Sequence, residues 1–236
     1  MPTATVPIAD ATVVAPVPGY LLDAYWWAYV HPNAVRVFER EWLVNLILFG
    51  NYGRLRDSAL AALGERIRGS TLQVACVYGD LTRRLVQRLA PGASLDVVDI
   101  LPIQLRNLAC KITPSDGVRL LHGDSASLPS PDAHYDQVLL FFLLHEQPAE
   151  TRRATLAEAW RVVKPSGRIV IVDYHRPGAW HPLRLLMRGI FRAFEPYAMD
   201  FWENPIEAFM PSAVLRSAVA RETFFGGLYQ RQVVIR

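Results

Sequence analysis

The sequence predicts an α/β fold built on an open, mostly parallel sheet, and three observations lead to this expectation. From Thr71 onward, short apolar runs alternate with segments of helical character, an order typical of strand–helix units. The run Asp136–Leu144 is apolar almost throughout, as expected for a strand covered on both faces. Near the C-terminus, Gly226-Gly227 separates two strand-like segments, which indicates an antiparallel hairpin.

The strands are placed where apolar runs are bounded by turn residues, and the helices where the period changes or a glycine or proline ends the segment. The expected strands are Leu72–Val77, Leu95–Ile100, Val118–His122, Asp136–Leu144, Arg168–Asp173, Arg221–Phe225 and Leu228–Ile235. The expected helices are Asn51–Gly64, Arg83–Leu89, Ile103–Cys110, Glu150–Val163, Pro182–Phe194 and Ser212–Val219.

The chain before residue 71 is expected to have two parts. Residues 1–18 contain no Lys or Arg, so they lack the basic start of a signal peptide and are predicted to form a disordered tail. Residues 19–70, rich in aromatic rings, are predicted to form an N-terminal helical segment. Residues 71–236 form the main domain, with a helical insertion at about residues 180–220.

Composition excludes several classes of protein. The net charge is only +3 for 236 residues, without the lysine-rich blocks of a nucleic-acid-binding protein. The most apolar run, Trp42–Phe49, is interrupted by Asn45 and is too short to cross a bilayer, which needs a helix of roughly 20 apolar residues. Two cysteines make a disulfide framework improbable and a reducing compartment the expectation.

Three features coincide at the carboxyl ends of the expected strands, where sheets of this kind bind ligands. The first strand is followed by the turn Val77–Thr82. The second ends in Asp99, about 20 residues after the turn, placed to accept hydrogen bonds from ribose hydroxyls. The third runs into Asp124, placed to accept from an adenine amino group. These features predict an adenosine-type cofactor, although ordinary loop capping is the alternative for both aspartates.

The turn favours S-adenosylmethionine over NAD. No G-x-G-x-x-G pattern is present to receive a pyrophosphate at a helix N-terminus, and a zwitterionic amino-acid tail tolerates Asp80 better than a diphosphate would. The expected cofactor-binding residues are Val77, Tyr78, Gly79, Asp80, Thr82, Asp99, Ile100, Asp124 and Ser125.

Several motifs resemble known families. AWRVVKPSGR at 159–168 and LLFFLLHE at 139–146 are similar to segments of the ubiquinone and menaquinone methyltransferases. VYGDLT at 77–82 and YWWAYVHP at 25–32 resemble the rhodoquinone-biosynthesis family RquA, a branch of those enzymes. The resemblance covers nearly the whole chain beyond the tail and implies a class I S-adenosylmethionine-methyltransferase-like Rossmann fold.

The resemblance also implies an activity. Members of this family convert ubiquinone to rhodoquinone by replacing a ring methoxy group with an amino group. S-adenosylmethionine serves as the amino donor, and manganese assists. The expected partner is therefore a lipid quinone, and the oligomeric state stays open.

The turn gives this activity a chemical rationale. The usual G-x-G-x-G pattern places glycines where this chain has Tyr78, Asp80 and Thr82, and those glycines let backbone approach the cofactor's amino-acid moiety. Our hypothesis is that Tyr78 and Asp80 turn the amine, instead of the sulfonium methyl, toward the quinone. We expect Tyr78, Asp80 and His145 to be catalytic.

Metal ligands are expected at the ends of the fourth and fifth strands. His145 and Glu146 follow the fourth, and Asp173 and His175 end the fifth. Imidazole and carboxylate ligands without thiolate suit manganese. Many methyltransferases that use no metal carry His or Glu after the fourth strand, so this assignment has a plain alternative.

The helix Pro182–Phe194 is a candidate membrane contact. Arg184, Arg188 and Arg192 recur every four residues and form one basic stripe, with apolar residues on much of the remaining surface. The alternative is a core helix with a solvated arginine face. We expect a peripheral protein on the cytoplasmic face of the inner membrane.

Two other functions stay open from the sequence. One is a conventional methyltransferase acting on a quinone or phenol, which Tyr78 and Asp80 disfavour. The other is a non-catalytic quinone-binding protein on a decayed scaffold, against which Asp99 and Asp124 argue.

Overall fold

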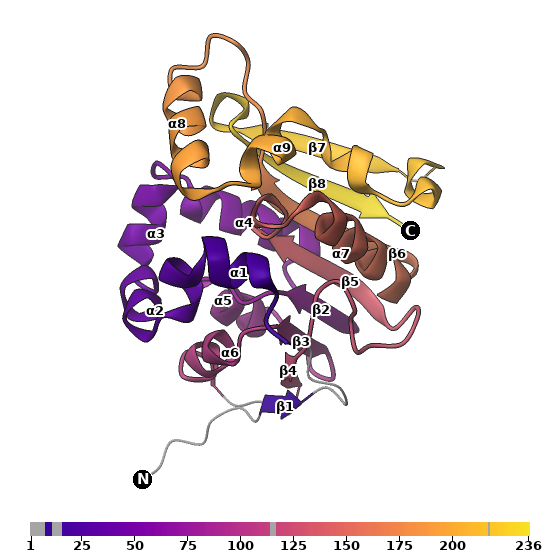
Figure 1. Ribbon diagram of the computed structural model, residues 1–236. Helices are drawn as coiled ribbons and strands as arrows, with labels where there is room; N and C mark the ends of the chain where they lie inside the picture. Colours follow the sequence, from indigo (N-terminus) through magenta and orange to yellow (C-terminus); the bar gives the residue numbers. More distant parts are fainter. Residues whose placement is uncertain (1–7, 11–15, 114–116, 217) are drawn as a thin grey trace.

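The described part of the chain forms one sheet flanked by helices (Figure 1). The structure is a computed structural model that describes residues 8–10, 16–113, 117–216 and 218–236. The strands are β1 (Ile8–Asp10), β2 (Ser70–Val74), β3 (Ser94–Asp99), β4 (Val118–His122), β5 (Tyr135–Phe141), β6 (Val163–Tyr174), β7 (Val219–Phe224) and β8 (Tyr229–Ile235).

The strand order is β1-β4-β3-β2-β5-β6-β8-β7. Pairs from β1 to β6 are parallel, while β8 runs antiparallel to β6 and β7. This confirms the expected α/β class with a mostly parallel sheet and a terminal antiparallel hairpin. The order reverses beside β2, the strand that leads into the turn Val77–Thr82.

Along the chain, four α-helices precede β2, three lie between β2 and β6, and two lie between β6 and β7 in the described residues. The α-helices are α1 (Gly19–Ala24), α2 (Pro32–Phe38), α3 (Glu41–Ile47), α4 (Tyr52–Leu63), α5 (Leu81–Gln87), α6 (Pro102–Ala109), α7 (Ala149–Val162), α8 (Arg184–Phe194) and α9 (Ala198–Glu203). The segment η1 (Trp26–Val30) is a π-helix. Short 3₁₀ helices are η2 (Leu144–Glu146), η3 (Ile206–Phe209), η4 (Ser212–Arg216) and η5 (Phe225–Gly227). Figure 1 shows α2 and α3 on one side of the molecule, with α8 above them.

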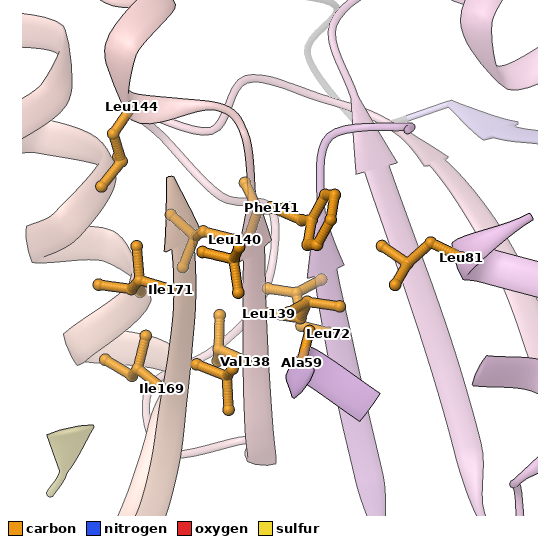
Figure 2. Packing of buried hydrophobic residues seen from close by; sticks show 14 of the residues in the cluster. Ala59, Leu72, Leu81, Val138, Leu139, Leu140, Phe141, Leu144, Ile169 and Ile171 are labelled. Atoms are coloured by element: carbon orange, nitrogen blue, oxygen red, sulfur yellow. The ribbon is translucent and has the colours of Figure 1, made fainter. Parts of the chain in front are cut away.

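The core is centred on β5 and its neighbours. Successive side chains of a strand point to opposite faces, and Leu139 and Leu140 are both fully buried, so both faces of β5 are covered. Helix α4 packs against β5 and β6, and α7 packs against β6. Figure 2 shows Val138, Leu140 and Ile171 among the packed side chains. The apolar run of β5 is therefore explained by burial on both faces of the sheet, as the sequence predicted.

Strand β5 ends three residues earlier than expected. The expected strand Asp136–Leu144 stops at Phe141, and Phe142 has a positive φ of 52°. The chain turns here because the Asp173 carboxylate accepts the backbone N–H groups of Leu144 and His145, at 2.9 and 3.3 Å. An acid on β6 thus fixes the segment after β5, which no local pattern on β5 encodes.

The ends of the chain hold two further differences. Most of the expected tail, residues 1–18, lies outside the described residues, but Ile8–Asp10 forms β1 and pairs with β4. This described piece of the tail is therefore ordered by backbone hydrogen bonding to the sheet edge. The expected helix Ser212–Val219 is a 3₁₀ turn, η4, and β7 already begins at Val219.

Within the described ranges, the helices are all too short or too polar to cross a bilayer.

Candidate functional site

A first cavity lies where β2, β3, β4 and β5 end. Its walls include Ala75, Asp99, Gly123 and Phe142. Tyr20 and Leu21 of α1 also line it, so the N-terminal helical segment reaches over the strand ends. The expected cofactor residues Asp99, Ile100, Asp124 and Ser125 all line this cavity.

Asp99 is held by backbone and keeps free acceptor capacity. Its Oδ2 accepts the Cys76 N–H at 2.7 Å and its Oδ1 accepts the Leu101 N–H at 2.8 Å. A carboxylate offers about four lone-pair positions, so both oxygens can still accept from a diol. Burial raises the pKa of Asp99 to about 6, although the two N–H groups oppose this shift.

The other end of the cavity offers acceptors for an amino group. Asp124 Oδ1 accepts the Ala126 N–H at 2.8 Å, and the Gln147 amide donates to Ser125 Oγ at 3.0 Å. Gln147 is fully buried, and its Oε1 has no hydrogen-bond partner among the described residues. A buried acceptor without a donor is costly, and an adenine amino group would satisfy it. These residues fit S-adenosylmethionine.

A second cavity of about 600 Å³ adjoins the first. It is lined mainly by apolar and aromatic side chains from η1, α2, α3 and α8. His145, Glu146 and Glu195 form its polar end. Apolar walls with a few convergent polar groups are typical of a small-molecule site.

The two cavities share a wall. Tyr29, Cys76, Gln104, Phe142 and Glu146 line both of them. Their common boundary is therefore the place where a group bound in the first cavity can reach a group bound in the second.

His145, which lines the second cavity next to Glu146, forms a buried pair with Asp173. His145 Nδ1 lies 2.7 Å from Asp173 Oδ1, and its Nε2 lies 3.8 Å from Glu146 Oε1. Burial disfavours the imidazolium, but Asp173 more than offsets this and raises the pKa of His145 to about 9. Burial raises the pKa of Glu146 to about 8, with His145 opposing. The Tyr29 hydroxyl donates to Glu146.

His145, Glu146 and Asp173 are neighbours, but His175, the fourth expected metal ligand, lies apart from them. His175 Nδ1 lies 2.6 Å from the Gly227 carbonyl, and His175 lines neither cavity. Asp173 already accepts three backbone N–H groups and His145. In the part of the chain that the structure describes, no three His, Cys, Asp or Glu side chains are arranged to hold a metal ion. The expected manganese site therefore does not fit these residues.

Tyr78 faces the N-terminal segment instead of the first cavity. Its hydroxyl donates to the Ala28 carbonyl at 2.8 Å and accepts from Gln104 at 2.8 Å. Its ring stacks on Tyr29 and Phe38, at centroid distances of 5.7 and 6.0 Å. Tyr78 and Val77 line the second cavity only. The aromatic stack draws the turn toward η1 and α2, so the expected cofactor contact of both side chains stays a prediction.

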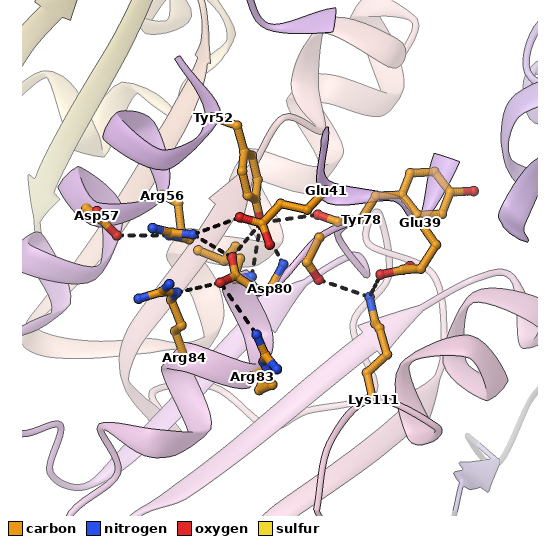
Figure 3. A network of polar contacts seen from close by, with 12 residues as sticks. Glu39, Glu41, Tyr52, Arg56, Asp57, Tyr78, Asp80, Arg83, Arg84 and Lys111 are labelled. Carbon is orange, nitrogen blue, oxygen red and sulfur yellow. Dashed lines mark hydrogen bonds and ion pairs between the residues drawn. The ribbon is translucent and has the colours of Figure 1, made fainter. Parts of the chain in front are cut away.

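Asp80 lies beneath the turn in a cluster of arginines (Figure 3). Its oxygens lie 2.7 Å from Arg56 and 2.5 Å from Arg84. Burial alone would raise the pKa of Asp80, but Arg84 and Arg56 outweigh it and hold this pKa below its usual value. Asp80 lines neither cavity, so the arginines account for the carboxylate that was expected to touch the cofactor.

Thr82 and Gly79 have structural roles in the turn. Thr82 is buried and donates from Oγ1 to Gln73 at 3.0 Å, so its side chain is also removed from the expected cofactor contact. Gly79 has a φ of +86°, and a Cβ there would clash with the Tyr52 hydroxyl. Glycine is required at this position for both reasons.

Sequence reasoning missed several lining residues. Gln104 and Gln147 carry no motif, and Glu195 follows α8 in an unremarkable loop. Tyr29 lies in an aromatic-rich segment, but that composition did not predict its contacts with Glu146 and Tyr78. Each reaches the site only because the N-terminal segment and α8 fold back over the strand ends.

Fold and site together define a class I S-adenosylmethionine-dependent methyltransferase fold. Residues 71–167 match the family model described as "Methyltransferase domain". Among solved structures, the pyocyanin biosynthetic protein PhzM has a TM-score of 0.62 at 20% identity, covering 93% of this chain and 64% of that one. The N-methyltransferase NodS from Bradyrhizobium japonicum WM9 has a TM-score of 0.57 at 11% identity, covering 79% and 98%. A complex of NodS with S-adenosylhomocysteine also matches, with a TM-score of 0.54 at 11% identity, covering 78% and 86%.

Curated relatives share part of this chain's sequence. Demethylmenaquinone methyltransferases of Staphylococcus aureus strains JH9 and Newman are 29% identical over 148 residues, 63% of this chain. The matched region spans 60% of the length of those relatives. These findings support an enzyme of the S-adenosylmethionine-dependent methyltransferase type that binds S-adenosylmethionine.

Proposed function

We propose that the protein acts in rhodoquinone biosynthesis and replaces a ring methoxy group of ubiquinone by an amino group. S-adenosylmethionine supplies the amine nitrogen. The observation that carries this proposal is the pair of adjoining cavities, one with a ribose-type acid and one large and apolar, with polar groups where they meet. The similarity to demethylmenaquinone methyltransferases supports a quinone as the substrate class.

We assign roles in this reaction to Glu146 at the common wall and to its neighbour His145 in the second cavity. Glu146 is placed to accept a proton from the amine as the nitrogen bonds to the ring carbon that bears the methoxy group. His145, oriented by Asp173, is placed to hold a proton at the quinone carbonyl oxygen. The methoxy group leaves with a proton as methanol, and the ring carbon is then joined to the cofactor's nitrogen. Loss of the Cα proton then passes two electrons into the quinone ring and gives a hydroquinone imine. Water hydrolyses this imine after release, which breaks the nitrogen–Cα bond and gives the aminohydroquinone and the 2-oxo acid of the cofactor. The apolar side chains of the second cavity exclude water from the ring.

Methyl transfer to a quinone or phenol is the second candidate. The family model and the curated relatives favour it. In that reaction S-adenosylhomocysteine is the only cofactor product, whereas amino transfer moves nitrogen onto the quinone. A non-catalytic quinone-binding protein would form neither product.

Nitrogen labelling distinguishes these functions. We expect incubation with S-adenosylmethionine labelled with nitrogen-15 at its amine, plus a short-chain ubiquinone, to give a quinone that is heavier by the labelled amino group and lighter by the methoxy group. Mass spectrometry measures both changes. An unlabelled, methylated product would establish the second candidate, and unchanged quinone would exclude both reactions.

The same reaction tests whether the activity needs the manganese that the family resemblance implies. Parallel incubations with a chelator and with added Mn²⁺ measure its contribution. We assign it no step, because no three of the expected ligands are arranged to hold a metal ion among the described residues.

The proposal places the enzyme at the cytoplasmic face of the inner membrane, because its substrate is a bilayer lipid. Leu46 and Ile47 of α3 and Phe194 of α8 are exposed and also line the second cavity. Leu185 and Leu186 extend this apolar surface along α8, at 78% and 51% exposed. We call these five residues the mouth. Arg184, Arg188 and Arg192 of α8 supply charge for anionic headgroups.

Vesicle flotation tests the membrane contact. We expect the double change Leu185→Glu plus Leu186→Glu to lower the fraction bound to phosphatidylglycerol-containing vesicles about tenfold, since burying one leucine is worth about 1.5–3 kcal/mol. Changing the three arginines to Glu should also reduce binding, because each is worth about 1 kcal/mol near an anionic leaflet.

The control for flotation is Val219→Glu on edge strand β7, which is 37% exposed and not part of the mouth. It should float like the unchanged protein. Equal flotation of the double leucine variant would reject the mouth as a membrane surface.

A further inference from the structure

The hydroxyl of Tyr52, the first residue of α4, is seated inside the turn between β2 and α5. It accepts the backbone N–H of Asp80 at 2.9 Å and that of Leu81 at 3.1 Å. Its oxygen lies 3.3 Å from Asp80 Oδ1 and 3.4 Å from the Tyr78 carbonyl oxygen, so its proton donates to one of these acceptors. A phenol has one donor and two acceptor positions, so all of them are used.

The phenol is fixed in this place by its surroundings. Tyr52 is 1% exposed, its ring packs edge-on against Phe141 at 6.4 Å, and Arg56 lies over its face at 5.6 Å. Figure 3 shows Tyr52 and Arg56 converging on Asp80. The absence of a side chain at Gly79 makes room for the hydroxyl.

Backbone N–H groups in such turns bind anionic ligand groups when they are open. In this chain the N–H groups of Asp80 and Leu81 already donate to Tyr52. A ligand carboxylate can use them only by displacing a buried, fully bonded phenol.

We infer that Tyr52 is a positioning residue that closes the turn to the carboxylate of the cofactor and leaves the amino-acid tail free to lie along the wall shared by the two cavities. This inference rests on the proposed function and adds the residue that decides where the tail goes. At that wall Glu146 and Gln104 replace the turn as polar neighbours of the tail. The closure is made by Tyr52 of α4, and the carboxylate of Asp80 serves to hold that phenol in place.

Ligand affinities test the closure without any turnover. Isothermal titration calorimetry compares S-adenosylhomocysteine with its decarboxylated analogue, which keeps the amine and lacks the carboxylate. For the unchanged protein we expect the two dissociation constants to differ by less than about threefold. In Tyr52→Phe, the freed N–H groups of Asp80 and Leu81 can bind the ligand carboxylate. S-adenosylhomocysteine should then bind about tenfold more tightly than the decarboxylated analogue, as for one gained charged hydrogen bond.

Phe141→Leu is the matched control. It disturbs the packing of the Tyr52 ring but leaves the hydroxyl, so the ratio should stay below about threefold even if both affinities fall. The ratio within one variant is insensitive to a general loss of stability, which thermal melting records separately. If Tyr52→Phe does not fold, the ratio in the unchanged protein decides.

A ratio of tenfold or more in the unchanged protein would overturn the inference, as would an unchanged ratio in folded Tyr52→Phe. Neither result bears on the nitrogen-labelling experiment, which tests amino transfer itself. The closure and the proposed function can therefore fail separately.

Discussion

Replacing His145 by glutamine is expected to lower the rate of amino transfer about 100-fold, because a positioned acid–base group contributes at least that factor. His145 lines the second cavity. Its Nδ1 is bound to Asp173 at 2.7 Å, so its Nε2 is the nitrogen left for a substrate oxygen. Glutamine keeps an amide of similar reach but cannot hold and release a proton. The measurement is kcat with a short-chain ubiquinone and saturating S-adenosylmethionine.

The control is His175→Gln, which removes the other histidine of this region. Its imidazole bonds the Gly227 carbonyl and lines neither cavity, so the rate should stay within about twofold, as for most surface changes. Equal losses in the two variants would argue for a shared structural or metal-binding role and against an acid–base role for His145.

Replacing Asp99 by asparagine is expected to weaken S-adenosylhomocysteine binding about 30-fold. Two charge-assisted hydrogen bonds to ribose hydroxyls would be lost, and such bonds are worth about 1.5–3 kcal/mol each before any compensation. The Cys76 and Leu101 N–H groups would also face an amide in place of a carboxylate. Calorimetry measures the affinity, and thermal melting reports whether the variant is folded.

In the unchanged protein, the titration of Asp99 should make the affinity for S-adenosylhomocysteine depend on pH. Burial raises the pKa of Asp99 to about 6, and only the ionised form accepts two hydroxyl hydrogen bonds. Affinity is therefore full above this pKa and falls as pH drops through it, by about tenfold between pH 7 and pH 5. Asp99→Asn should lose this step, and Asp124→Asn should keep it. A step that persists in Asp99→Asn would assign the titration to another group.

The fold was largely predictable because its determinants are local. A strand covered on both faces must be apolar along its whole length, and β5 shows this pattern. The hairpin between β7 and β8 was predictable for a similar reason, since Gly226 and Gly227 both have positive φ. The acids Asp99 and Asp124 were predictable as cavity residues because parallel strands end at one edge of the sheet.

The roles within the turn were not predictable in the same way. The pattern VYGDLT showed that the usual glycines are absent, but it did not show where the new side chains point. Asp80 turns to Arg56 and Arg84, and Tyr78 turns to Ala28 and Gln104. Two of these partners lie on elements that precede β2, so their contacts depend on how α4 and η1 pack.

The sequence by itself determined the α/β sheet, its closing hairpin and the two acids at the strand ends, because period, apolarity and turn chemistry act over a few residues. Only the tertiary structure decided which side chains fill the turn, how the two cavities adjoin and why His175 lies apart from the other expected metal ligands. Those outcomes depend on contacts such as Tyr52 with Asp80 and Tyr29 with Glu146, which are 28 and 117 residues apart in the chain. Such contacts arise only when the N-terminal helices pack over the strand ends, which no local pattern specifies.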